Sequence, residues 1–247
     1  MLAPFFRPWQ ILILALLTSV NASSADLIPH TASYTAKIQK GTSIKGTAVR
    51  ELMKLDNGQW RYRFDVDSFI ADIRESVRFE WQYNQVIPHQ YRYQLSGFFI
   101  RDREYKVEFD WKKRIARSKV KKQRWEIKKI PSNTVDRLGY QLQLSMDVYS
   151  GKRDMLYQIV HKGRLKENRF KVIGEERINT ALGELDSIVV KKIRSESSKR
   201  QTSLWFSKKY QFLLLKMTQR EADGEQYEIN IKSAKIDGEP FAISKQL

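Results

Sequence analysis

Apolar and polar residues alternate with a period of two along most of this chain. In Trp60–Asp67 every even-numbered residue is apolar and every odd-numbered residue is charged. Successive side chains of a strand point to opposite faces, so such a segment has one buried face and one solvated face. The same alternation returns in three further segments: Val77–Tyr83, Tyr105–Trp111 and Tyr227–Ile231. The pattern therefore predicts antiparallel sheet with one face in water.

Two turn signals separate such runs. Asp56-Asn57-Gly58 and Ala222-Asp223-Gly224 each stand between alternating segments and predict hairpins.

One segment, Thr134–Tyr149, has helical spacing instead. Its apolar residues recur three or four positions apart, at Val135, Leu138, Leu142, Met146 and Tyr149. Asn133 or Thr134 can cap a helix, Asp136 suits its positive end, and Gly151 follows as a stop. We expect one amphipathic helix of about four turns, in which Gly139 allows a close approach to a strand.

The expected order is roughly seven strands, this helix and about six more strands, without the βαβ rhythm of a parallel sheet. The fold class is therefore all-β and mainly antiparallel. We expect a curved sheet, as a half-barrel or barrel, with the helix packed on it.

The N-terminus has the plan of a secretory signal. Arg7 precedes a short apolar run, Ile11–Val20, and small residues follow at Ala22–Ala25. A membrane anchor needs about 20 apolar residues, and Asn21 interrupts this run well before that. We expect cleavage after Ala25, with Ala22 as the alternative. This predicts a periplasmic protein of the bacterial envelope without a transmembrane anchor after cleavage.

Composition limits the mature chain further. Residues 26–247 are predicted to form a single β-rich domain, because a 12% aromatic content supplies a core and all-β domains of this size are common. The absence of cysteine excludes disulfides and thiol catalysis. A net charge of +17 suggests an anionic partner. For an exported protein we expect lipid or acidic glycan and no nucleic acid.

Four groups of residues follow one another along the chain after the signal peptide. They are Gly41-Thr42-Ser43-Ile44-Lys45-Gly46, Val135-Asp136-Arg137-Leu138, Val172–Thr180 with Gly183 and Glu184, and Thr202–Phe206 with Tyr210. By their order and spacing they resemble the exported bacterial family called domain of unknown function 3108, over roughly Tyr34 to Ser233. The resemblance implies a periplasmic β-rich fold, similar in broad architecture to curved-sheet lipoprotein carriers, and it implies no activity.

The strongest functional signal is a basic segment, residues 112–129, with ten lysines and arginines and one acid, Glu126. Charges this dense repel one another and favour contact with an anion or a membrane surface. The alternative is a solvated hairpin whose lysines protect a strand edge from aggregation. The residues assigned to anion contact are Lys112, Lys113, Arg114, Arg117, Lys119, Lys121, Lys122 and Arg124.

Apolar residues beside this segment admit two interpretations. Phe98-Phe99-Ile100 is a fully buried strand or the lip of an apolar ligand site, and Trp111 and Trp125 pack in the core or contact a membrane or ligand. As candidate lining residues we take Phe98, Phe99, Trp111 and Trp125.

No catalytic or metal site is predicted. His30, His89 and His161 have no partner at metal-ligand spacing and are interpreted as surface or turn residues. Asp65 and Asp67 share a strand face, and there acids usually pair with lysine or arginine across the ladder.

The leading hypothesis is a non-enzymatic periplasmic binding protein for an anionic amphiphile, a lipid or glycolipid of the envelope, without a cofactor. The alternative is an envelope assembly or scaffold protein that docks a protein or acidic glycan through its basic face. A third hypothesis is a hydrolase of envelope polymers that uses Asp65 and Asp67, or Glu175.

Overall fold

The computed structural model describes residues 26–98, 100–210 and 213–241. The predicted signal segment, residues 1–25, and Phe99 lie outside this range. Within the described residues, no helix combines the length and the apolar character needed to span a bilayer.

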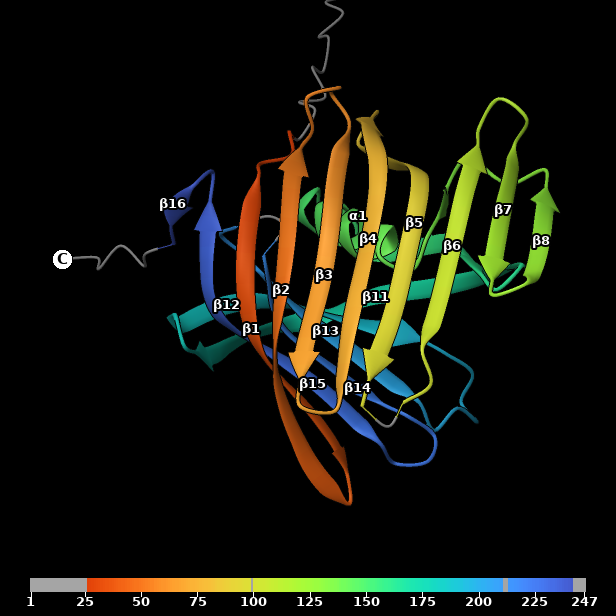
Figure 1. The fold of residues 1–247 in the computed structure, drawn as a ribbon. Coiled ribbons are helices and arrows are strands. Elements are labelled where there is room, and N and C mark those ends of the chain that lie inside the picture. Colours follow the sequence, from red (N-terminus) through yellow and green to blue (C-terminus); the bar gives the residue numbers. More distant parts are fainter. Residues whose placement is uncertain (1–25, 99, 211–212, 242–247) are drawn as a thin grey trace, which may run out of the picture.

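The first layer is a meander of eight strands, each antiparallel to the next (Figure 1). The alternating segment Trp60–Asp67 lies in β3, where Trp60 and Tyr62 are buried and Asp67 is exposed. Both predicted hairpins are present, the first between β2 and β3 and the second between β14 and β15. The bounds are β1 His30–Lys40, β2 Thr42–Lys54, β3 Trp60–Ser68, β4 Ala71–Gln82, β5 Gln85–Gly97, β6 Arg103–Asp110, β7 Ile115–Val120 and β8 Gln123–Lys128.

The second layer follows the helix and crosses behind the first at a steep angle (Figure 1). It joins the first layer edge to edge, because β1 pairs with β2 on one side and with β15 on the other. Its strands are β10 Asp154–His161, β11 Arg164–Thr180, β12 Gly183–Ile193, β13 Gln201–Ser207, β14 Leu214–Arg220 and β15 Gln226–Ile236, with the short β9 Thr134–Val135 and β16 Glu239–Pro240.

The strand order therefore runs in one sheet from β8 through β1 and β15 to β9. Over the range that the structure describes, these two ends do not pair, so the sheet is curved and unclosed. All neighbouring strands are antiparallel except β9, which bridges β10 in parallel. The predicted fold class is confirmed. Nine strands precede the helix and seven follow it in the described range, more than expected because short bridges are included. The single-domain organisation of residues 26–247 stays a prediction.

Helix α1, Gly139–Tyr149, lies between the two layers and contacts β5 and β10. It begins five residues later than predicted. Thr134 and Val135 pair with β10 instead, and the carboxylate of Asp136 accepts the amide N–H groups of Leu138 and Gly139, both at 2.8 Å. The predicted close approach at Gly139 is present, since a Cβ there would lie 3.3 Å from Val86.

Both layers cover the helix, so it is buried on more sides than a one-faced helix would be. Leu142, Leu144 and Met146 join a core that includes Phe79 of the first layer and Phe170 of the second. The helix thus packs against both layers.

Candidate functional site

A buried arginine interrupts the apolar inner face of β2. Arg50 lies between Ala48 and Leu52 in the alternation and is 2% exposed. Its guanidinium donates to neutral oxygens, Tyr62 Oη at 2.8 Å and Gln141 Oε1 at 2.7 Å, and its buried Nε has no partner in the described part of the chain. The group also lies 4.4 Å above the ring of Phe64. Burial of a charged group that is not paired with an opposite charge is costly, and such positions are often functional.

Two buried acids lie near this arginine, Glu75 on the inner face of β4 and Asp136 in the connection between β9 and α1. Glu75 pairs in register with Phe64 and accepts a hydrogen bond from Tyr91. Burial raises the pKa of Glu75, against the lowering effect of nearby Arg137. Burial also raises the pKa of Asp136 to about 7, in part because Glu75 is close. Burial therefore disfavours the charged form of both acids.

The second layer adds two cations that face the same region. Lys192 of β12 lies 5.8 Å above the ring of Phe170. Burial, reinforced by the charges of Arg194 and Arg137, lowers the pKa of Lys192 to about 8. Arg194 donates to Thr202 Oγ1 at 3.0 Å, and burial lowers its pKa as well.

We call Arg50, Arg137, Lys192 and Arg194 the interior cation cluster; Arg50 is buried, Lys192 and Arg194 are partly buried, and Arg137 is exposed at its margin. Tyr140 of α1 connects them: burial raises its pKa, and the charges of Arg137, Arg50 and Arg194 act on it in the opposite direction. Its ring stacks on Phe170, with centroids 5.3 Å apart. Cations from two strands, β2 and β12, and from the two loops that hold Arg137 and Arg194 thus lie around an aromatic platform between the layers. The arrangement suits binding of an anion that carries apolar groups.

The titration of Asp136 gives a direct test of this electrostatic arrangement. Its raised pKa means that the folded protein keeps a proton that the unfolded chain releases. The resulting stabilisation is complete below pH 3.8 and is lost as the pH rises through about 7. Asp136→Asn keeps a carbonyl oxygen for the helix amides and cannot titrate. Between about pH 4 and about pH 8, urea unfolding should show wild type losing about 3 kcal/mol relative to the variant. A constant difference would show that Asp136 titrates normally.

The basic segment forms the β7–β8 hairpin at one end of the sheet. All eight residues assigned to anion contact are exposed. Arg117 is engaged with Glu126 at 3.0 Å, and Arg114 donates to the carbonyl of Ile130 at 3.1 Å. The edge position of β8 fits the alternative interpretation that these charges keep other chains from pairing with it.

The register places part of the basic segment in a larger array. On the outer face of β5–β8, four cations lie directly opposite one another on successive strands. Of these, Lys106 pairs with Glu104 at 2.8 Å. Adjacent strands are about 4.8 Å apart, and like charges directly opposite each other repel. We call this array the outer cation row: Arg92, Lys106, Lys119 and Arg124.

The candidate lining residues have different environments. Phe98 follows β5 and is 87% exposed, so the buried-strand interpretation is wrong for this residue. Trp111 stacks on Phe109 and donates to the carbonyl of Pro88 at 2.8 Å. Trp125 packs against Gly163 of the β10–β11 turn.

The acids considered for hydrolysis are paired with donors. Asp65 lies 3.2 Å from Arg63 Nε, and Asp67 pairs with Arg74. Glu175 lies inside β11 rather than beside a turn, and it pairs with Lys208 at 2.6 Å.

The histidines are not all at the surface as predicted. His30 is buried at the start of β1. His89, in β5, pairs with Glu80 at 2.9 Å. No group of three His, Cys, Asp or Glu residues positioned to hold a metal ion occurs in the described residues.

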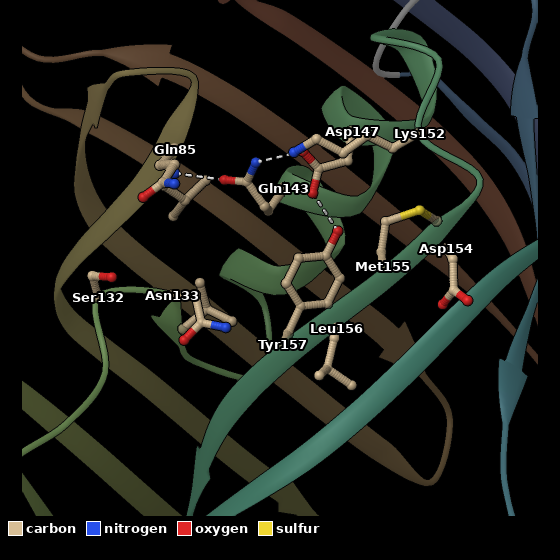
Figure 2. A pocket seen from close by; sticks show the side chains of 12 residues that line it. Gln85, Ser132, Asn133, Gln143, Asp147, Lys152, Asp154, Met155, Leu156 and Tyr157 are labelled. Atoms are coloured by element: carbon tan, nitrogen blue, oxygen red, sulfur yellow. Dashed lines mark hydrogen bonds and ion pairs between the residues drawn. The ribbon is translucent and has the colours of Figure 1, made fainter.

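A pocket of about 180 Å³ opens where the C-terminal half of α1 meets β10 and the start of β5 (Figure 2). Asp147 lines it and accepts hydrogen bonds from Gln143 at 3.1 Å, Lys152 at 2.7 Å and Tyr157 at 2.6 Å. Since these donors saturate the carboxylate, we interpret this group as a structural connection between helix and strand.

Comparison with known proteins supports the fold. The model of a family of unknown function, DUF3108, matches residues 33–232. No curated protein matches the chain. Among solved structures, a β-barrel-like protein of domain of unknown function DUF1849 from Brucella abortus superposes with a TM-score of 0.59 at 9% identity, covering 85% of this chain and 98% of that one.

Two further similarities are weaker. The Pseudomonas aeruginosa MucA/MucB complex gives a TM-score of 0.38 at 10% identity, covering 88% of this chain and 54% of that one. A putative outer membrane lipoprotein-sorting protein domain from Vibrio parahaemolyticus gives a TM-score of 0.24 at 11% identity, covering 88% of this chain and 87% of that one. At such identities a likeness concerns the fold alone.

Proposed function

The chain belongs to the DUF3108 family of unknown function, and from that premise we propose that it is a non-catalytic, periplasmic binding protein of the bacterial envelope. It holds an anionic amphiphile, a lipid or glycolipid, between its two layers. The anionic head group contacts the interior cation cluster, and the apolar part lies along the aromatic residues beside it.

One observation carries this proposal: cations from both layers converge on the stacked rings of Tyr140 and Phe170, and none of the four forms an ion pair with an acid of the described residues. Arg50 donates to neutral oxygens, and the pKa of Lys192 is lowered by burial and by Arg194 and Arg137. A bound anion would relieve both the desolvation and the mutual repulsion. Natural proteins keep such unfavourable arrangements mainly where function uses them.

The direct test is mass spectrometry of solvent extracts from protein purified natively without detergent. We expect a stoichiometric anionic amphiphile with wild type and its loss with Arg137→Gln/Arg194→Gln. The matched control is Lys119→Glu/Arg124→Glu, which changes cations on the outer face and should retain the molecule. Empty wild-type protein in repeated preparations, or equal loss in both variants, would reject binding between the layers.

The outer cation row supports a second candidate function, an envelope scaffold that docks an acidic protein or glycan. Four aligned cations form an extended positive surface, which suits a partner with an extended acidic surface. Chemical crosslinking in cells should then recover a stoichiometric partner with wild type. Recovery should fall at least tenfold with Lys119→Glu/Arg124→Glu and persist with Arg137→Gln/Arg194→Gln. The two functions thus predict opposite responses to the same pair of variants.

A further inference from the structure

Two phenylalanines stand almost entirely in solvent at one end of the first layer. Phe69, in the β3–β4 turn, is 98% exposed, and Phe98, after β5, is 87% exposed. Single exposed apolar residues are common, but two adjacent large ones at turn tips are a recurrent mark of an interaction site. Strands β3 and β5 both end at the lower edge of the first layer in Figure 1.

The chain holds these two turns together. Ala71 pairs with Gly97, and the amide N–H of Phe98 donates to the carbonyl of Ile70 at 3.3 Å. A Cβ on Gly97 would lie 2.3 Å from that carbonyl oxygen, so only glycine permits the approach. The β3–β4 turn is also fixed internally, because Ser68 Oγ donates to the carbonyl of Ala71 at 2.7 Å. Both phenylalanines are therefore presented by defined turns.

Cations lie at the same end of the first layer as the two phenylalanines. Arg101 belongs to the β5–β6 connection and Arg103 begins β6, and both are exposed. Strand β7 runs in the same direction as β3 and β5, so its turn, with exposed Lys121 and Lys122, lies at the same end. We call Phe69, Phe98 and these four cations the apolar tip.

The acids at this end do not neutralise the apolar tip. Asp67 pairs with Arg74, and Glu104 pairs with Lys106 at 2.8 Å. This leaves Asp72 and Asp102 beside four cations. Apolar side chains at a turn, flanked by lysine and arginine, match a bilayer surface with anionic head groups, where rings enter the interface and cations contact phosphate.

We propose that the apolar tip docks the protein on the surface of an anionic lipid bilayer, with Phe69 and Phe98 inserted at the head-group level. Charge complementarity selects this occupant over a neutral bilayer, because the cations add attraction that two phenyl rings alone do not supply. The inference is independent of the proposed ligand between the layers, since the apolar tip lies at the strand ends and outside the interior cation cluster.

Vesicle co-sedimentation tests the contribution of the rings. Mature protein should bind phosphatidylcholine vesicles that contain phosphatidylglycerol and bind pure phosphatidylcholine vesicles at least tenfold more weakly. Phe69→Ser/Phe98→Ser should reduce binding to the anionic vesicles at least tenfold. The matched control is Tyr83→Ser, which removes a 94% exposed ring from the β4–β5 turn at the opposite end and should bind like wild type. Unchanged binding by the double variant overturns the proposal.

A site-specific label tests insertion itself, and the absence of cysteine makes single labelling simple. A polarity-sensitive fluorophore attached through Phe98→Cys should shift to the blue on anionic vesicles, and the same label attached through Tyr83→Cys should not. Equal signals at both positions would contradict insertion at the apolar tip. A third outcome is that wild type does not bind vesicles and that Phe69→Ser/Phe98→Ser changes the oligomeric state. The apolar tip would then be a contact between copies of the chain, and membrane docking would be overturned.

Discussion

Gly163→Ala is expected to lower the free energy of unfolding by about 2–4 kcal/mol. Gly163 lies in the β10–β11 turn with φ +72°, and a Cβ there would be 2.3 Å from Cγ of Trp125 in β8. The left-handed backbone is unfavourable for alanine, and the added methyl group displaces a packed tryptophan. Urea unfolding monitored by circular dichroism measures the loss.

Gly224→Ala is the matched control for this substitution. Gly224 also has a positive φ, +89°, but no atom lies within 4 Å of its added Cβ. Its cost should be the backbone contribution alone, about 1 kcal/mol. A second substitution, Trp125→Ala, should relieve part of the cost of Gly163→Ala, because the clash partner is gone. Equal costs at the two glycines, or strict additivity with Trp125→Ala, would contradict this account.

The prediction concerns more than one turn, because this contact joins the two layers far from the β1–β15 pairing. The amide of Lys162 donates to Tyr105 Oη at 2.8 Å, and the amide of Gly163 donates to Ser118 Oγ at 3.2 Å. Trp125 therefore connects the β7–β8 hairpin to the second layer. Within the basic segment, Trp125 thus has a structural role, whereas the lysines and arginines on either side of it face solvent.

Alternation predicted the strands well, because one wet face and one buried face leave a local record in the sequence. The start of the helix left no such record. Thr134 and Val135 fit a helical spacing, but they pair with β10, which comes more than twenty residues later. A contact at that separation outweighs local propensity and cannot be derived from the segment itself.

Part of the interior cation cluster could have been predicted from the sequence, but it was missed. Arg50 occupies an inward position between Ala48 and Leu52, and Glu75 precedes Val77 and Phe79 in the same way. A charged residue where the alternation predicts an apolar one indicates a buried charge. The dense run of charges at residues 112–129 instead consists of residues that face solvent. That Arg50 and Arg194 act on the same tyrosine, Tyr140, depends on the pairing of β1 with β15. No local pattern reveals this pairing.

The interior cation cluster has a physical consequence that separates a binding role from a structural one. A group selected for stability should stabilise the folded chain, whereas a group kept for binding can destabilise the empty protein. Lys192 fits the second case, since its pKa falls from 10.5 to about 8 in the folded state. Below pH 8 the folded chain therefore holds an ammonium group that would be more stable in water, and this destabilisation disappears as the pH rises to 10.5.

Lys192→Met should accordingly raise stability and lower binding together. At neutral pH the free energy of unfolding of the variant should exceed that of wild type by about 1–2 kcal/mol. This is less than the full pKa shift corresponds to, because water still reaches part of the ammonium group. The thioether can keep the contact with Phe170. The advantage should shrink as the pH rises from about 8 to about 10.5. Bound anionic amphiphile, measured in native extracts, should fall at least tenfold.

Lys191→Met is the control for Lys192→Met, because Lys191 is the neighbouring residue of β12 and points to the opposite face. It should change neither the pH dependence of stability nor the bound amphiphile. If Lys192→Met instead destabilises the protein, Lys192 has a structural role and the interior cation cluster loses its strongest argument. If it stabilises the protein but leaves the bound amphiphile unchanged, the buried charge is unfavourable for another reason, and the outer cation row becomes the better candidate for the anion-binding surface.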